Sequence, residues 1–528
     1  MTARIDVDEL RARWFAGGEL ALLDAREQGA FSAEHLFWAC CLPLSVLELR
    51  LGELVPRRDT PIVWCDDGAS GLAERAAARA EALGWTDVAV LDGGNAAWAR
   101  AGHELYSGVN VPSKAFGEFV ETVYGTPHLP AAELAERIAA GDDLVILDSR
   151  PMREFNRMSI PGGVDCPGAE LAYRVHDVAP DPATTVVVNC AGRTRSIIGA
   201  QSLINAGIPN RVVALENGTM GWELAGFSCA HGERSHAPDP SAGGLARAEE
   251  SAARVARRFG VVRIDHATLD RWLADRTRTT VVLDVRSPEE FDAGHLPNTR
   301  SAPGGQLVQA TDEYVATWRS RMVLVDDTGV RATMTASWLR QLGVHEVAVL
   351  ERAFDARSLV SGPAEQPAEP LPSVPTIEPA ELAGLPGAAV VDLADSIRYR
   401  RRHLAGAWWG VRSRFAEAVA AIAPAPATVV LTSPDGVLAT LAHADAAAAW
   451  PLADVRVLAG GTAAALAAGC AAEAGFDRPT TTADDVWYKP YDADDQEVVR
   501  QHMQDYLTWE VALVAQIERD DMVSFQRF

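Results

Sequence analysis

The sequence has few of the features that place a protein in a membrane, on nucleic acid or outside the cell. It contains no uninterrupted apolar run long enough to span a bilayer, and its first residues lack the apolar core of a signal peptide. Its 48 Lys and Arg residues against 72 Asp and Glu residues give a formal net charge of −24. This charge argues against nucleic acid and membrane surfaces as partners. We therefore expect a cytoplasmic protein.

Cysteine is also scarce. The seven cysteines are scattered and odd in number, which does not suggest a disulfide framework and fits a reducing compartment. The 12 histidines show no spacing typical of a metal site. We expect no metal and no cofactor, so the chemistry should rest on the side chains themselves.

What is present is a fourfold repeat along the 528 residues. A short apolar strand ends in an aspartate four times, at Asp24, Asp148, Asp284 and Asp392. A second strand follows each time and ends 41 or 42 residues later, at Cys65, Cys190, Asp326 and Ser433. Helical patterns separate the strands, as is typical of parallel α/β sheets. We predict four tandem α/β domains, at residues 1–110, 122–232, 258–358 and 374–476, and a partly helical C-terminal tail at 477–528.

The end of the strand at 185–189 carries the most chemistry. Cys190 follows this β-branched run directly, and a helical pattern begins a few residues later. Backbone N–H groups and the dipole at a helix N-terminus attract anions. Arg193 and Arg195 add positive charge, so the loop favours the reactive thiolate. We predict that Cys190 is a nucleophile beside an anion-binding loop made of Ala191, Gly192, Arg193, Thr194, Arg195 and Ser196.

The other three loops lack parts of this arrangement. Cys65 is followed by two aspartates, whose charges disfavour both a thiolate and an anionic substrate. The loop at Asp326 keeps an arginine, Arg331, but has no nucleophile. Ser433 has neither a thiol nor a cation beside it, and a serine needs a base to act as a nucleophile. We therefore predict one competent site, in the second domain, and inactive first, third and fourth domains.

These residues resemble the rhodanese (sulfurtransferase) family. The resemblance rests on the Asp-x-Arg after the first strand, on the strand-Cys loop, and on two motifs of the third unit, Glu290-Phe291 and Gly294-His295-Leu296-Pro297. It covers nearly the whole chain as four tandem rhodanese-like domains and leaves the tail outside. It implies small doubly wound parallel-sheet domains and a loop cysteine that carries a persulfide.

The resemblance also indicates the sulfur donor. Many family loops read Cys-x-x-Gly-x-Arg-Ser, whereas here Gly192 stands one position earlier and Arg193 occupies the glycine position. The mercaptopyruvate-using branch has a Gly-Ser-Gly-rich loop with little arginine, which this loop does not match. We therefore expect thiosulfate as the donor.

The expected reaction is a ping-pong sulfur transfer by a thiosulfate sulfurtransferase. Thiosulfate binds with its sulfonate near Arg193, Arg195 and the loop amides, and the Cys190 thiolate attacks its outer sulfur. Sulfite leaves, and cyanide or a thiol such as glutathione takes the sulfur from the Cys190 persulfide. The physiological acceptor stays open, as do a protein acceptor and a homo-oligomer.

Other residues of the second domain have supporting roles in this scheme. Asp148 is expected to brace the loop by accepting backbone hydrogen bonds. Arg150 is expected to be an internal ion-pair partner, because equivalent arginines recur in the domains predicted to be inactive. Ser196 either donates to the sulfur anion or caps the helix. Cys166 is expected to be a packing residue, and sulfur relay by Cys65 or Cys166 stays open.

Two alternatives compete with this interpretation. A cysteine-dependent phosphatase generally needs Cys-x5-Arg, whereas Cys190 to Arg195 is Cys-x4-Arg, and no general acid is evident. A sulfur carrier or regulatory scaffold would explain why three of the four loops are degenerate. Activity on an aryl phosphate would favour the first alternative, and sulfur transfer that survives loss of Cys190 would favour the second.

Overall fold

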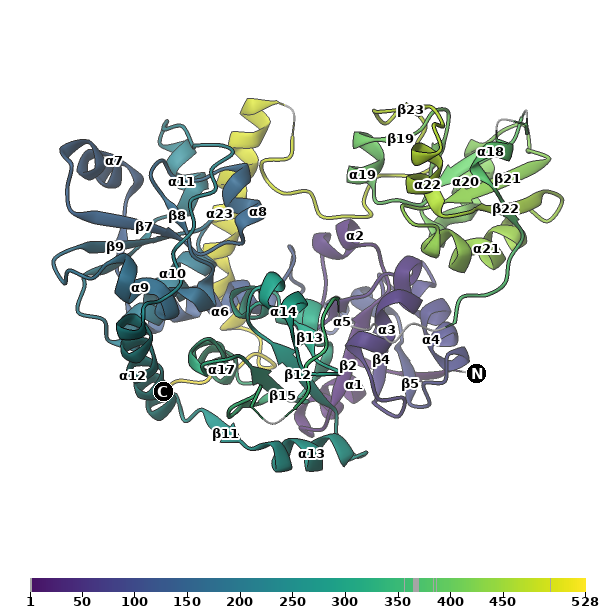
Figure 1. Ribbon diagram of the computed structural model, residues 1–528. Coiled ribbons are helices and arrows are strands. Elements are labelled where there is room, and N and C mark those ends of the chain that lie inside the picture. The colour runs from purple at the N-terminus through teal and green to yellow at the C-terminus, as the bar shows by residue number, and fades with distance from the viewer. Residues whose placement is uncertain (1, 356, 364–369, 383, 386, 494) are drawn as a thin grey trace.

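The computed structural model describes residues 2–528 except 356, 364–369, 383, 386 and 494. Four parallel sheets follow one another along the chain, one in each predicted domain. Their strand orders are β1-β5-β4-β2 with β3 beside β2, β6-β10-β9-β7-β8, β11-β16-β15-β12-β13 and β17-β22-β21-β18-β20. The four orders are equivalent, which confirms the predicted repeat of α/β units (Figure 1).

The elements of the first and second units are as follows. The first unit contains β1 (Ala3–Ile5), α1 (Val7–Phe15), β2 (Leu20–Asp24), α2 (Gln28–Ala33), β3 (Cys40–Cys41), α3 (Leu47–Leu54), β4 (Ile62–Cys65), α4 (Leu72–Ala82), β5 (Val88–Leu91) and α5 (Gly94–Arg100). Helix α6 (Val111–Tyr124) connects it to the second unit. The second unit contains β6 (His128–Leu129), α7 (Ala131–Ala140), β7 (Leu144–Asp148), α8 (Met152–Arg157), β8 (Val164–Asp165), α9 (Leu171–Val178), β9 (Thr185–Asn189), α10 (Thr194–Ala206), β10 (Val212–Leu215) and α11 (Gly218–Leu224).

The third and fourth units repeat this pattern after the connecting helix α12 (Ala242–Phe259). The third contains β11 (Val262–Ile264), α13 (His266–Ala274), β12 (Thr280–Asp284), α14 (Pro288–Ala293), β13 (Arg300–Ser301), α15 (Gly304–Gln309), α16 (Thr311–Tyr314), β14 (Thr317–Trp318), β15 (Arg321–Val325), α17 (Val330–Leu342) and β16 (Glu346–Leu350). The fourth contains β17 (Thr376–Ile377), α18 (Pro379–Leu382), β18 (Ala389–Asp392), α19 (Ser396–Arg401), β19 (His403–Leu404), β20 (Trp408–Trp409), α20 (Phe415–Ala421), β21 (Thr428–Thr432), α21 (Val437–Ala449), β22 (Asp454–Leu458), α22 (Gly461–Ala467) and β23 (Ala472–Glu473).

The second sheet shows why its strands are so apolar. Val186 and Val188 of β9 belong to the core beneath α9 and α10, whereas Val187 belongs to the core beneath α7 and α11. A parallel sheet covered by helices on both faces buries every residue of its central strands. All five residues of β9 are buried accordingly. This arrangement confirms the doubly wound α/β fold.

Strand register corrects one part of the repeat alignment. In the second sheet Asp148 pairs with Asn189, so Cys190 is the first residue after the pair. In the first sheet Asp24 pairs with Cys65. Cys65 therefore corresponds to Asn189, and Asp66 occupies the position of Cys190. The sequence alignment of Cys65 with Cys190 was wrong by one residue, because spacing alone could not say where each strand ends.

The third and fourth sheets agree with the alignment of their loops. Asp284 pairs with Val325, so Asp326 occupies the cysteine position of the third unit. Asp392 pairs with Thr432, so Ser433 occupies it in the fourth. The four positions to compare are thus Asp66, Cys190, Asp326 and Ser433.

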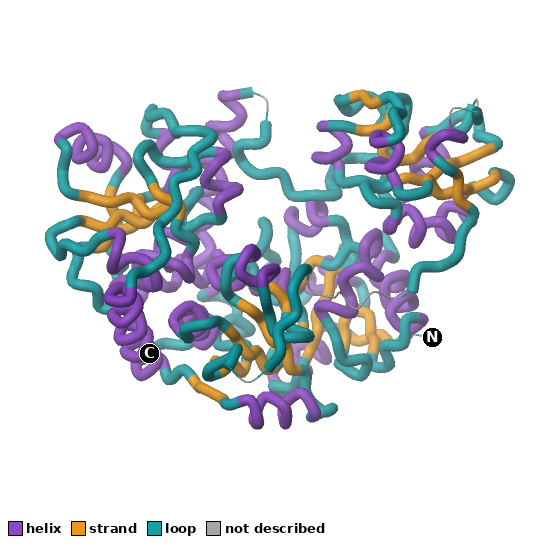
Figure 2. The backbone as a smooth tube through the Cα atoms, in the orientation of Figure 1, coloured by secondary structure: helices purple, strands orange, loops and turns teal. Residues whose placement is uncertain are grey.

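The units form an arc with the second and fourth at its two ends (Figures 1 and 2). The second and third pack closely, since a Cβ on Gly168 would lie 3.2 Å from Gly305 Cα. Strand β14 of the third unit pairs with β2 of the first. The first and fourth meet through an ion pair of 2.7 Å between Arg412 and Glu48. No helix in the described ranges is long and apolar enough to cross a membrane.

The C-terminal tail returns from the fourth unit to the second. Its helix α23 (Gln496–Ile517) lies within the tail at 477–528 that was predicted to be partly helical. Helix α23 packs against α6 and α11. Beyond it, the carbonyl of Met522 accepts a hydrogen bond from Trp38 of the first unit at 2.9 Å. The tail therefore ties three units together and crosses the second unit where its loops lie.

Candidate active site

Cys190 lies at the carboxyl end of β9, the central strand of the second sheet. Its side chain is buried, with 2% of the residue exposed. The thiol lies 3.5 Å from the hydroxyl of Ser196, and that hydroxyl donates to the carbonyl of Arg193 at 2.8 Å. Of the two roles left open for Ser196, the helix cap is absent, since α10 has no side-chain cap hydrogen bond, whereas the hydroxyl does stand beside the sulfur.

The N-terminus of α11 fixes the backbone of the Cys190 loop by hydrogen bonds. The N–H groups of Thr219 and Met220 donate to the carbonyls of Cys190 at 2.9 Å and Ala191 at 3.0 Å. A Cβ on Gly218 would lie 2.4 Å from the Cys190 carbonyl oxygen, and its φ of +55° also favours glycine. The loop backbone is thus fixed before any substrate arrives.

The equivalent loops of the first and third units contain a carboxylate where this loop has a thiol. Asp66 accepts hydrogen bonds from the N–H groups of Gly68 at 2.7 Å and Ala73 at 3.1 Å. Asp326 accepts three, from the N–H groups of Gly329 at 2.6 Å, Arg331 at 2.9 Å and Ala332 at 3.2 Å. These loop amides therefore bind a negatively charged group in two of the four units.

Asp148 and Arg150 form a buried pair below the loop. Arg150 donates from Nε to Asp148 Oδ1 at 2.8 Å and from its terminal nitrogen to Oδ2 at 2.7 Å. Asp148 also accepts from the Arg150 N–H and from the side-chain amide of Asn189, the residue before Cys190. The aspartate braces the end of β9 mainly through these two side chains rather than through loop amides. The same pair recurs as Asp24 with Arg26 and Asp284 with Arg286.

Arg193 is turned toward α6 rather than toward the thiol. Its guanidinium donates to both oxygens of Glu118 at 2.8 Å and also pairs with Glu121. Burial alone would lower the pKa of Arg193, but Glu118 and Glu121 raise it above its ordinary value. We expected the sulfonate of thiosulfate to bind near Arg193, but in the structure this guanidinium is already paired with two carboxylates. Sequence spacing gave no sign that the connecting helix would supply two carboxylates.

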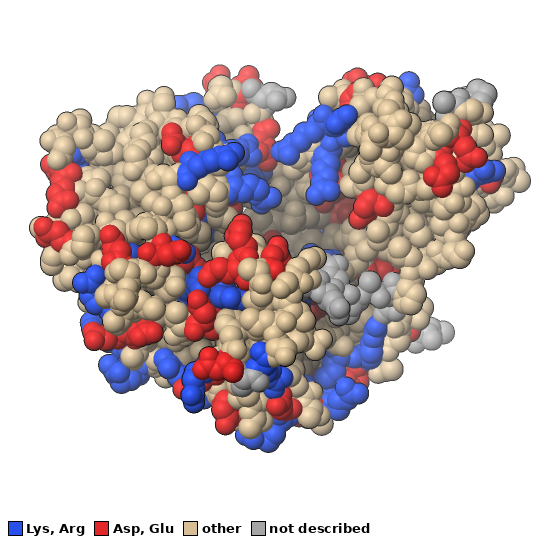
Figure 3. All heavy atoms as spheres, in the orientation of Figure 1, with Lys and Arg blue, Asp and Glu red and all other residues tan. Residues whose placement is uncertain are grey.

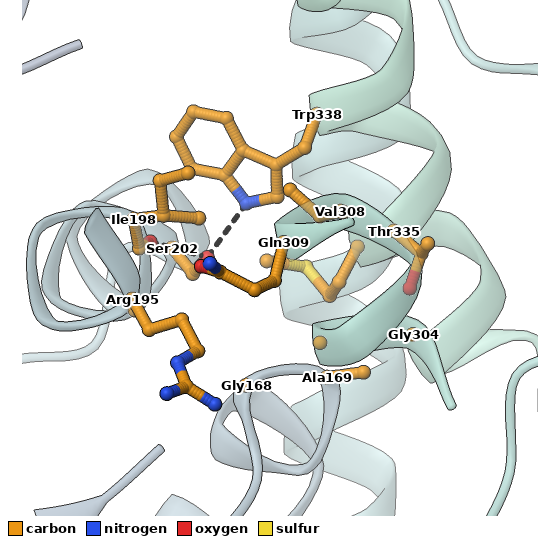
Figure 4. Close-up of a pocket in the computed structure, with 13 residues that line it drawn as sticks. Gly168, Ala169, Arg195, Ile198, Ser202, Gly304, Val308, Gln309, Thr335 and Trp338 are labelled. Carbon is orange, nitrogen blue, oxygen red and sulfur yellow. Dashed lines mark hydrogen bonds between the residues drawn. The ribbon is translucent and has the colours of Figure 1, made fainter. Parts of the chain in front are cut away.

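Arg195 is paired as well, but it lies within electrostatic reach of the Cys190 sulfur. It donates to Glu154 at 2.8 and 3.2 Å and to Gln306 of the third unit at 3.1 Å. Burial alone would lower its pKa, and the charges of Glu154 and, to a smaller extent, Cys190 raise it. Figure 4 shows Arg195 extending from α10 beside Gly168 at the boundary with the third unit. Arg195 is thus the cation in electrostatic reach of the thiol.

The tail contributes residues that sequence reasoning missed. Lys489 faces Glu154, and burial together with Arg195 and Arg153 lowers its pKa even though Glu154 opposes the shift. Arg153 and Arg157 of α8 are exposed nearby. In the view of Figure 3, Lys and Arg side chains gather along the recess between the second and fourth units. A chain with a large negative net charge therefore presents a basic surface near the active-site loop.

Helix α23 covers the loop itself. A Cβ on Gly192 would lie 3.0 Å from Glu510 Oε2 and 3.2 Å from Tyr506 Cε1. Leu507 and Met503 of the same helix share an apolar cluster with Ala191. The sequence signal was the apolar stripe of the helix, in which Glu510 takes a buried position. Gly192 is needed because the helix approaches the loop so closely.

Two cavities border the loop. One of about 260 Å³ is lined by Ser196 and Arg193 together with Asn217 and Val511. The other lies between the second and third units and has a volume of about 30 Å³, enough for little more than one water molecule. Figure 4 shows the small one crossed by the hydrogen bond of 2.7 Å from Trp338 to Ser202. The larger cavity is the one of substrate size.

The remaining cysteines have a different environment. Cys65 and Cys166 are fully buried, and burial raises the pKa of each thiol well above its ordinary value. Such thiols are inert at neutral pH. No group of three or more metal-ligating side chains occurs among the described residues.

Parallel sheets with this strand order, and a cysteine in the loop between the central strand and a helix N-terminus, define the class of protein. The sequence matches the rhodanese-like domain family over residues 6–101, 130–225 and 266–358. The chain belongs to this family, which confirms the resemblance to rhodanese-like sulfurtransferases. The fourth unit lies outside the three matched segments and has the same strand order.

One solved structure is similar over nearly the whole chain. It is that of a thiosulfate sulfurtransferase from Pseudomonas aeruginosa, 47% identical, with a TM-score of 0.95 and 99% of each chain covered. A second relative is an HTH-type transcriptional regulator, Rv0324, of Mycobacterium tuberculosis. It is 31% identical over 112 residues, and the chain spans 48% of that regulator's length. The first match extends to the arrangement of all four units and the tail.

Proposed function

We propose that the protein is a thiosulfate sulfurtransferase that carries the transferred sulfur as a persulfide on Cys190. The observation that carries this proposal is the comparison of the four loops. Only the second has a thiol at the position where Asp66 and Asp326 place a carboxylate among loop amides. An amide cradle that accepts a carboxylate is also suited to a thiolate or a persulfide anion.

The donor half-reaction follows from this geometry. Thiosulfate enters from the cavity bordered by Ser196 and Arg193, and its sulfonate binds to the amides of residues 191–196 at the start of α10. Because Arg193 and Arg195 are already paired with carboxylates, the amides and the helix dipole supply much of the attraction. The Cys190 thiolate attacks the outer sulfur, the S–S bond of thiosulfate breaks, and sulfite leaves with the bonding pair.

The acceptor half-reaction returns the enzyme to its starting state. Cyanide or a thiol attacks the terminal sulfur of the persulfide, and Cys190 leaves as a thiolate. The substantial likeness to the Pseudomonas aeruginosa thiosulfate sulfurtransferase supports thiosulfate as the donor.

Mass spectrometry of the intact protein after thiosulfate treatment tests the proposal. The wild type should gain one sulfur atom, and the Cys190→Ser variant should gain none. Cys470→Ser, at a half-buried cysteine of the fourth unit, is the matched control and should load like the wild type. Loading of Cys190→Ser, or a sulfur located on Cys65, would overturn the assignment.

A further inference from the structure

Glu510 is a buried carboxylate that the reaction above does not use. Its residue is fully buried in α23. Its Oε1 accepts hydrogen bonds from the hydroxyls of Tyr506 at 3.0 Å and Thr194 at 3.2 Å. Lys114 Nζ lies 3.3 Å from the same oxygen. The lysine lies close enough to offset the negative charge of the buried carboxylate.

The other carboxylate oxygen of Glu510 has no hydrogen-bond partner among the described residues. A buried carboxylate oxygen without a donor costs free energy, so such an atom calls for a functional or solvent partner. Oε2 faces the active-site loop, since it lies 3.0 Å from where a Cβ on Gly192 would be. The free oxygen is therefore directed at the loop that begins with Cys190.

Tyr506 supports the same placement. Burial and the neighbouring Glu510 raise the pKa of Tyr506 well above its ordinary value, and the charge of Cys190 adds to this effect. The tyrosine thus lies within electrostatic reach of the sulfur and holds Glu510 through its hydroxyl. Val511, the residue after Glu510, lines the substrate-sized cavity. The cavity therefore reaches the turn of α23 that carries Glu510 as well as the loop residues Arg193 and Ser196.

We propose that Glu510 accepts the proton of a thiol acceptor when the Cys190 persulfide is discharged. This inference rests on the function proposed above. The S–H proton of the acceptor passes to Oε2, and the electron pair left on the acceptor sulfur forms a bond to the terminal sulfur of the persulfide. The bond between that sulfur and Cys190 Sγ breaks, and Sγ keeps the pair as a thiolate. The terminal sulfur, left as an anion when sulfite departed, becomes the terminal sulfur of the acceptor persulfide anion, so atoms and charge balance without an oxidant or reductant.

The two half-reactions can be measured separately on the full-length protein. Protein loaded with thiosulfate and freed of excess donor is mixed with glutathione, and the loss of the persulfide is followed over a range of pH. Glu510→Gln should load like the wild type, because loading releases sulfite and removes no proton from a thiol. At roughly two pH units below the pKa of the acceptor thiol, the persulfide of this variant should be discharged about 100-fold more slowly than that of the wild type.

The pH profile separates proton transfer from a structural role. As pH rises toward the pKa of the acceptor thiol, the acceptor ionises in solution and no longer needs a base. The deficit of Glu510→Gln should therefore shrink about tenfold per pH unit. A deficit of constant size at every pH, or discharge at the wild-type rate, would overturn the inference. If the wild type does not load sulfur on Cys190 at all, the proposed function fails instead.

Two further variants serve as controls. Glu497→Gln changes an exposed carboxylate in the first turn of the same helix and should discharge like the wild type at every pH. Tyr506→Phe removes one hydrogen bond to Oε1 and keeps the carboxylate. We expect a deficit of a few-fold with the pH profile of the wild type. A profile like that of Glu510→Gln would assign the proton transfer to the tyrosine and overturn the proposal for Glu510.

Discussion

The second and third units have the same fold and a loop of equal length, yet the position after the central strand holds Cys190 in one and Asp326 in the other. The Asp326 carboxylate collects three backbone N–H groups and fills the anion site of its loop permanently. In the proposed function, Cys190 leaves that site to a transient anion. When the protein supplies its own carboxylate, as Asp326 does, the loop has no site left for an anion from solution.

The arginine five residues after this position also differs in its contacts between the two units. Arg195 and Arg331 occupy equivalent positions, but Arg331 is wholly buried and pairs with Glu170 of the second unit, with Glu290 and with Asp327. In the third unit the cation joins two units together. In the second, Arg195 also reaches the third unit through Gln306, but it lies within electrostatic reach of the Cys190 sulfur. The same pattern of residues therefore places an arginine beside a thiol in one unit and within a cluster of carboxylates from two units in the other.

The variant with the largest expected effect is Cys190→Asp, which gives the second loop the residue that the third loop has at the same position. We expect complete loss of sulfur transfer, since no nucleophile remains. The carboxylate should collect loop amides as Asp66 does, so the melting temperature should stay close to that of the wild type. A sulfur-transfer assay and thermal unfolding check both parts. Transfer that persists in this variant would show that the comparison has the wrong loop.

The paired arginines allow a second test with opposite outcomes in the two units. Arg195→Ala removes a cation within electrostatic reach of the thiol, and we expect kcat/KM for thiosulfate to fall about 10- to 100-fold. Arg195→Lys should recover part of this loss, because it restores the charge without the planar fork. Arg331→Ala should leave kcat/KM of the folded protein unchanged and lower the free energy of unfolding by about 3–5 kcal/mol. Equal effects of the two alanine variants on kcat/KM would contradict the division of roles.

Much of this could be predicted from the sequence. The apolar strand endings at Asp24, Asp148, Asp284 and Asp392 marked four parallel sheets, because buried parallel strands read as continuous apolar runs. The placement of Cys190 between a central strand and a helix N-terminus followed from the same pattern. These features depend on local periodicity, which a single sequence contains.

The partners of the site residues could not be predicted in this way. Glu118 lies 75 residues from Arg193, and Glu510 lies more than 300 residues from Thr194. Which carboxylate meets which arginine depends on how α6 and α23 pack, and that is decided by tertiary contacts. The one-residue error at Cys65 has a similar cause, since only the pairing of β2 with β4 fixes where that strand ends.

The pH dependence of stability should differ between the third loop and the second. Burial raises the pKa of Asp326 from 3.8 to about 6, although Arg331 and the loop amides oppose the shift. The folded state therefore holds a proton more tightly than the unfolded state between about pH 4 and 6, and stability falls as pH rises through this window by up to ~1.4 kcal/mol per unit. Asp326→Asn should lose this dependence. Denaturant unfolding of both proteins at pH 4.5 and 7 measures it, and an unchanged slope would contradict the assignment.

The smallest expected effect belongs to the first loop. Asp66→Ala removes a carboxylate that accepts from two loop amides and from the hydroxyl of Ser70 at 3.0 Å. We expect the free energy of unfolding to fall by about 2 kcal/mol, since buried donors lose their acceptor, with no change in sulfur transfer by the folded protein. Asp87→Ala, at an exposed position of the same unit, is the control and should change stability by less than about 0.5 kcal/mol. Because Asp66 fills the place that Cys190 occupies in the second unit, a loss of activity without loss of stability would mean that the first loop takes part in catalysis and is not a structural copy.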